Sequence, residues 1–186
     1  MPPASRITSV TINRAPVLTL WAAVVAERLG FARDEALTLG KSMAGLNAQS
    51  KGRALGIYSS ARGTYPGHRK KGELKPGETL AVDLLGRTIP AVHTPDGVRA
   101  VHGGKPVSPK SVEQYLEGKF KDGLGAVRAA MESLARSFEP EDLAARAMGL
   151  YEEFRPEIPR GKKGWGAAGV LDLERVRSLG QKGRVF

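Results

Sequence analysis

A nearly continuous apolar run from Ala15 to Ala26 constrains the fold more than any other part of this sequence. The run is interrupted by Thr19 and is too short to span a bilayer, because a membrane helix needs about 20 apolar residues. Pro16 suits the first turn of a helix, where its missing N–H is not required, and Gly30 stands where a C-terminal cap is expected. A helix that is apolar on almost every side has to be buried, so we predict that this one lies at the centre of the core, with Trp21 as packing material.

A second helix is predicted from a cap at Asp34 to about Ser50, and the short link between the two helices favours an antiparallel or steeply angled hairpin. Small residues recur every four positions along one side of the second helix, at Ala36, Gly40, Ala44 and Ala48. Such a ridge lets another helix approach closely. A helix–turn–helix DNA reader is a narrower alternative, but its second helix would be unusually long and the densest charge lies after it.

Alternating apolar residues after the turn at residues 75–78 predict three short strands, within 80–84, 87–94 and 98–102. Pro95, Asp96 and Gly97 are typical of a three-residue hairpin loop, in which Thr94 would face Val98. Pro90 cannot donate to a strand ladder, so its strand is expected at an edge or with a bulge. These strands predict a small antiparallel sheet that needs helices against it to be stable.

The C-terminal half is predicted to be helical. Ser108 and Pro109 are a strong helix start, and the buried side of that helix is assigned to Val112, Tyr115, Leu116 and Phe120. Two further amphipathic helices follow up to about residue 155, and the tail ends in a short helix that a cap at position 172 would begin. At the other end of the chain, the apolar residues of segment 7–12 are compatible with a short strand.

Together these patterns predict an α+β protein that is predominantly helical, with an N-terminal helical hairpin, a small three-stranded antiparallel sheet and C-terminal helices. At 186 residues the chain is long enough for a single compact domain. Its expected parts are a helical hairpin over about 16–50, a basic loop over 51–78, a small sheet over 79–107, helices over 108–155 and a basic, Gly- and Pro-rich tail over 156–186.

Positive charge is concentrated in two segments. The chain has a net charge of +10, and residues 51–75 hold seven cations against one acid, which gives +6. Residues 155–186 hold eight cations and three acids, which gives +5, so the rest of the chain carries −1. If both segments are irregular and meet in space, they form a positive face that attracts polyanions.

The first basic segment also carries tyrosines among its cations, and tyrosine can stack on a base or hydrogen-bond to a phosphate. The segment lacks the Gly-Lys-Ser/Thr ending of a nucleotide-binding P-loop. We therefore expect binding of DNA or RNA through the phosphate backbone, with weak sequence selectivity. The predicted contacts are Lys51, Arg53, Tyr58, Arg62, Tyr65, His68, Arg69, Lys70, Lys71, Lys75, Arg160, Lys162 and Lys163.

No catalytic signature is present, and a binding protein is favoured over an enzyme. The absence of cysteine excludes disulfides, thiol nucleophiles and thiolate metal sites. The predicted hairpin pairs His93 with Arg99 and His102 with Pro90, which puts the two histidines on opposite sides of the sheet and predicts no metal site. No cofactor is expected. The N-terminus lacks the order of a secretory signal, so the expected location is the cytoplasm, without membrane attachment.

Two other functions stay open at this level. A structural or protein-interaction module, such as a homodimer packed through the small-residue ridge, would use the same cations to bind an acidic partner. An enzyme acting on an anionic substrate would need a deep pocket that gathers His93 or His102 with Asp83.

Overall fold

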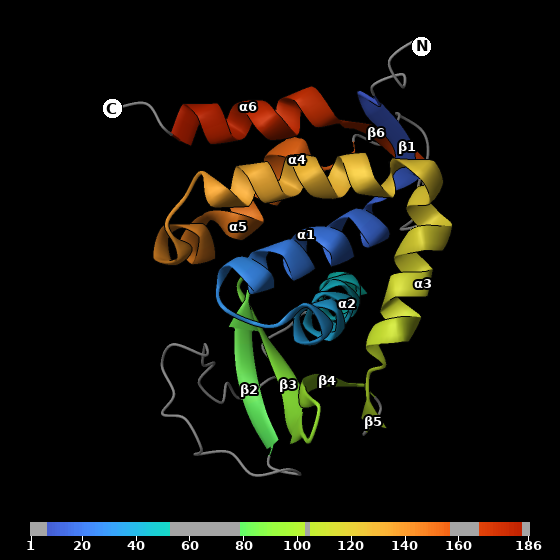
Figure 1. The fold of residues 1–186 in the computed structure, drawn as a ribbon, viewed down its shortest axis with the longest axis vertical. Helices are drawn as coiled ribbons and strands as arrows, with labels where there is room; N and C mark the ends of the chain where they lie inside the picture. Colours follow the sequence, from blue (N-terminus) through green and yellow to red (C-terminus); the bar gives the residue numbers. More distant parts are fainter. Residues whose placement is uncertain (1–6, 53–78, 103–104, 157–167, 184–186) are drawn as a thin grey trace.

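The computed structural model describes residues 7–52, 79–102, 105–156 and 168–183, and for 47–52, 102 and 181–183 it describes only the backbone. These residues form an α+β structure in which helices predominate over two small antiparallel sheets (Figure 1). The helices are α1 (Arg14–Arg28), α2 (Arg33–Gly52), α3 (Pro109–Phe120), the 3₁₀ turn η2 (Lys121–Gly123), α4 (Leu124–Arg136), α5 (Pro140–Phe154) and α6 (Leu173–Gly183). The strands are β1 (Ser9–Asn13), β2 (Thr79–Leu84), β3 (Arg87–Thr94), β4 (Gly97–His102), β5 (Lys105–Pro106) and β6 (Ala168–Asp172).

Helix α1 lies in the middle of the structure, between α4 on one side and α2 with the larger sheet on the other (Figure 1). Every residue from Pro16 to Ala26 is buried, as the apolar run predicts. Trp21 is 0% exposed, its indole N–H donates to the carbonyl of Ala147 at 2.9 Å, and its ring meets Phe154 edge-on at 5.3 Å. The prediction of a central helix, with Trp21 as a core residue, is confirmed.

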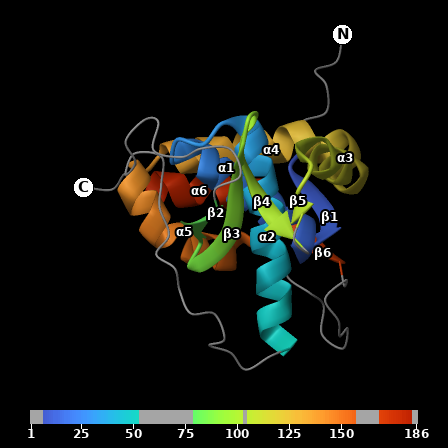
Figure 2. The ribbon, with the colours of Figure 1, turned by 90° about the horizontal axis from the view of Figure 1, so that it is seen from below.

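The two N-terminal helices form a hairpin whose axes cross at a steep angle (Figures 1 and 2). Gly30 follows α1 with a φ of 115°, the left-handed conformation that glycine adopts without strain. At the crossing, a Cβ on Gly40 would lie 2.5 Å from the carbonyl oxygen of Thr19 and 2.9 Å from the backbone N of Ala23. The small-residue ridge therefore packs against α1 of the same chain at Gly40.

The start of α2 differs from its prediction by one residue. The helix begins at Arg33, so Asp34 lies inside its first turn and is not the cap. Instead Glu35 reaches back, and its Oε1 accepts the N–H of Ala32 at 2.9 Å. A side chain in the third helical position that satisfies a preceding backbone N–H is one half of a capping box.

The larger sheet has four antiparallel strands in the order β2-β3-β4-β5, one more than predicted. Pro90 lies in β3, which is internal, so the edge position, one of the two alternatives expected for this strand, is wrong. Proline has no N–H to donate to a neighbouring strand. The β3–β4 ladder ends at the pair of Ala91 and Ala100, so Pro90 is not required to donate to β4. On its opposite edge β4 pairs with β5, where Val101 faces Pro106.

The β3–β4 hairpin is shorter than predicted. Thr94 pairs with Gly97 across a two-residue turn, where the sequence pattern predicted pairing with Val98. The hydroxyl of Thr94 donates to the carbonyl of Gly97 at 2.7 Å and accepts the N–H of Asp96 at 3.2 Å, which closes the turn locally. Every pair along the two strands shifts by one residue as a consequence.

Side chains of α2 accept hydrogen bonds from N–H groups on the edge of β4 that faces away from β3. Oε2 of Glu35 accepts the N–H of Val98 at 2.8 Å, and the hydroxyl of Thr38 accepts the N–H of Ala100 at 3.0 Å. Unpaired N–H groups along a strand edge invite pairing with other chains, so these two bonds protect the edge while fixing α2 to the sheet. Gly97 suits this position because its φ of 119° is a conformation that residues with a Cβ rarely adopt.

The first and last regular parts of the chain meet in the second sheet. Strand β1 confirms the short strand that the N-terminal apolar residues allowed, and its partner β6 was not predicted. The register pairs Val10 with Leu171 and Ile12 with Gly169, so alternate residues of both strands face the core. This sheet therefore ties the C-terminal segment to α1.

The C-terminal helices follow their sequence signals closely. Ser108 caps α3 by accepting the N–H of Ser111, with Pro109 in the first turn. Val112, Leu116 and Phe120 of α3 are buried, as predicted from their spacing. Within the described ranges, no helix has the length and apolar character needed to cross a membrane.

Tyr151 of α5 supplies a test of this packing through pH. Burial raises the pKa of its hydroxyl from 10.0 to about 12. The unfolded chain therefore loses this proton at a lower pH than the folded chain, so the stability that Tyr151 contributes is present below pH 10 and is lost as pH rises towards 12. Over that range wild type should lose up to about 2–3 kcal/mol more than a Tyr151→Phe variant in urea unfolding. Equal losses in both proteins would contradict the burial of this hydroxyl.

Candidate nucleic-acid interface

Helix α2 carries the one predicted contact that falls within a described element. Lys51 lies in its last turn, and the C-terminal part of α2 extends beyond the other elements in the view of Figure 2. The structure describes the backbone of Lys51 but not its side chain. The other predicted contacts lie outside the described residues: Arg53, Tyr58, Arg62, Tyr65, His68, Arg69, Lys70, Lys71, Lys75, Arg160, Lys162 and Lys163.

The elements on either side of the first basic segment are fixed to the body of the protein. Upstream, α2 packs on α1 at Gly40 and is bonded to β4 through Glu35 and Thr38. Downstream, β2 begins at Thr79, which pairs with Val92 of β3. The helix that leads into the segment and the strand that follows it are therefore both held by tertiary contacts.

Within the second basic segment, the predicted contacts lie in residues 157–167, and two arginines hold the elements beside them. At the end of α5, Nε of Arg175 donates to the carbonyl of Glu153 at 2.6 Å, and Nε of Arg14 donates to the carbonyl of Pro156 at 2.8 Å. The last carbonyls of a helix have no partner within it, and cationic donors satisfy them well. These bonds fix the position at which the chain enters residues 157–167.

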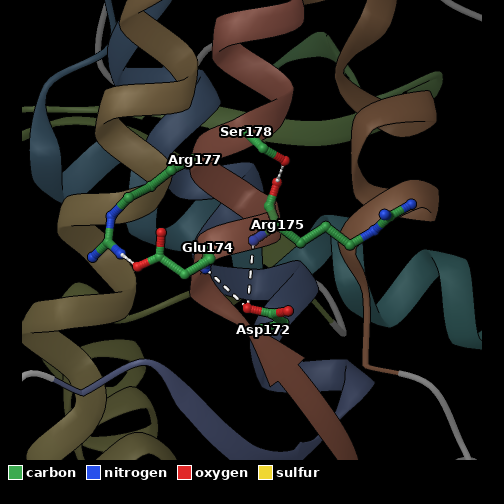
Figure 3. Close-up of polar contacts among 5 residues, drawn as sticks. All are labelled: Asp172, Glu174, Arg175, Arg177 and Ser178. Atoms are coloured by element: carbon green, nitrogen blue, oxygen red, sulfur yellow. Dashed lines mark hydrogen bonds and ion pairs between the residues drawn. The ribbon is translucent and has the colours of Figure 1, made fainter.

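Beyond residue 167 the chain forms β6 and then α6, which is the short final helix predicted for the tail. Figure 3 shows the start of α6, where Oδ1 of Asp172 accepts the N–H groups of Glu174 and Arg175 at 3.0 and 3.4 Å. The predicted cap is confirmed. Arg177 pairs with Glu174 at 2.8 Å, so Arg175 and Arg177, two of the cations counted in the tail, are engaged within the protein.

The observed register changes the positions of the histidines and acids that an enzyme would need. His93 pairs with Val98 and not with Arg99, so the predicted pairing that separated the two histidines is wrong. Asp83 pairs with Thr88 and accepts its hydroxyl at 2.8 Å, on the face of the sheet opposite to His93. A pocket that joins Asp83 with His93 is therefore incompatible with this sheet.

Two other observations bear on catalysis. Among the residues that the structure describes, no group of three or more His, Asp or Glu side chains is arranged to hold a metal ion. An open cavity of about 170 Å³ lies between α1 and α4, and Arg128, which pairs with Glu27 and Glu132, neutralises its acids. Its lining contains no histidine or nucleophile and consists of Val24, Glu27, Arg28, Glu132, Ala135 and Arg136.

A pair of lysines lies where α2 meets α3. Nζ of Lys41 is 3.9 Å from the centre of the Tyr115 ring, and Lys119 follows Tyr115 by four residues on α3. Burial, and then the neighbouring charge of Lys119, hold the pKa of Lys41 below its usual value. Burial also raises the pKa of Tyr115, which a hydrogen bond with Thr19 opposes. In the described part of the chain, neither lysine forms an ion pair with an acid.

Sequence patterns did not indicate these two lysines, because both lie in helices whose net charge is near zero. Tyr115 was assigned to the buried side of α3 and is half-buried. One sequence feature could have indicated that Lys119 lies near Tyr115. The two residues are four positions apart, which puts both on one side of the helix. Comparison of the chain with protein-family models, curated proteins and solved structures gives no match.

Proposed function

We propose that this protein binds DNA or RNA through phosphate contacts made by its two basic segments, with weak sequence selectivity. The observation that carries the proposal is the separation of charge. Residues 51–75 hold seven cations and one acid, and residues 155–186 hold eight cations and three acids. The rest of the chain, its framework, holds 14 cations and 15 acids, a net charge of −1.

This separation has a simple physical reading. Some arginines of the framework have structural partners, as Arg14 and Arg128 show. A protein that is basic only for solubility has no reason to leave its framework almost neutral. Cations gathered in a few segments can instead neutralise adjacent phosphates and release their condensed counterions, which is the main source of nonspecific affinity for nucleic acids.

The proposed contacts divide into two kinds. Lys51, Arg53, Arg62, Arg69, Lys70, Lys71 and Lys75 of the first segment would contact phosphates, with Arg160, Lys162 and Lys163 of the second segment adding to them. Tyr58 and Tyr65 can stack on unpaired bases, and His68 can add a polar contact. Phosphate contacts carry no sequence information, so we expect similar affinities for unrelated sequences of one polymer.

The charge-removal variant Arg69→Ala, Lys70→Ala, Lys71→Ala tests the assignment of the first segment. Loss of three phosphate contacts should lower the affinity for a mixed-sequence oligonucleotide about tenfold at low salt and reduce the slope of log K against log salt by about 2–3. Fluorescence anisotropy at several salt concentrations measures both quantities.

A matched control removes the same charge from the framework. Lys105, Lys110 and Lys121 are exposed, and their joint replacement by alanine lowers the net charge by the same three units. The control should leave the slope within about one unit of wild type. If both triple variants bind alike, the effect comes from net charge alone and the assigned segment is wrong. An unchanged affinity and slope in the first variant would also contradict it.

A further inference from the structure

We draw no further inference here: the strongest candidate, the open cavity between α1 and α4, has both of its acids paired with Arg128, and nothing in the described part of the chain shows what would occupy it.

Discussion

Replacing Gly40 with alanine is expected to destabilise the protein by about 2–3 kcal/mol, although alanine favours a helix by about 1 kcal/mol over glycine. The new Cβ would lie 2.5 Å from the carbonyl oxygen of Thr19 and 2.9 Å from the backbone N of Ala23. Both atoms belong to the main chain of buried α1, so neither can rotate away. The two helices would have to separate and lose close packing along their whole crossing.

Gly45 offers a matched control on the same helix. It is exposed, and a Cβ there would meet nothing within 4 Å. Gly45→Ala should therefore stabilise the protein by about 0.5–1 kcal/mol through helix propensity alone. Urea unfolding followed by far-UV circular dichroism measures both variants. A Gly40→Ala variant as stable as Gly45→Ala would show that α1 and α2 do not cross at this residue.

Replacing Trp21 with alanine should have a larger effect, a loss of about 4 kcal/mol. The indole is fully buried, packs edge-on against Phe154 and donates to the carbonyl of Ala147. It therefore joins α1 to α5, and its removal leaves a cavity at the centre of the core. Chemical denaturation with a structural probe other than tryptophan fluorescence measures the change.

The variant Trp21→Phe keeps the measurement interpretable if the alanine variant does not fold. Phenylalanine retains most of the apolar contact and loses the N–H donor, so we expect a loss of about 1–2 kcal/mol. A graded series, with phenylalanine between wild type and alanine, is the expected result. A phenylalanine variant as stable as wild type would argue against the hydrogen bond to Ala147, and an unaffected alanine variant against burial of the indole.

Local sequence signals predicted the helical part of the fold well. The apolar run ending at Ala26, the cap at Ser108 and the cap at Asp172 each specify an element through interactions within a few residues. The fold class was accordingly predictable. The predicted start of α2 was wrong by one residue. Asp34 was expected to cap the helix from outside, but it lies in the first turn, and Glu35 accepts the N–H of Ala32.

Features that depend on distant partners were predicted less well. Strand β6 has no strong pattern of its own, and it forms because β1, from the other end of the chain, pairs with it. The β3–β4 register differed by one residue because Thr94 closes a two-residue turn with its own hydroxyl. Pro90 was expected at an edge, whereas the ladder ends beside it within the sheet.

In the candidate interface, too, features set by neighbouring residues could be predicted and features set by distant partners could not. Clusters of charge along the chain are visible in the sequence, so the contacts proposed between Lys51 and Lys75 could be named from it. Lys41 and Tyr115 are separated by 74 positions, and only the packing of α2 on α3 brings the ammonium group to 3.9 Å from the ring centre. Sequence alone also counted Arg175 and Arg177 among the excess cations, and their partners became known from the structure.

The salt dependence of binding is the measurement that best tests whether this protein binds nucleic acid through phosphate contacts. The purified protein should be titrated with a fluorescent mixed-sequence duplex, and with single strands of DNA and RNA, at salt concentrations from about 20 to 200 mM. We predict that log K falls linearly with log salt, with a slope near −5 for the duplex, and that unrelated sequences bind alike. The absence of binding at about 20 mM salt, or an affinity that does not depend on salt, would contradict the claim.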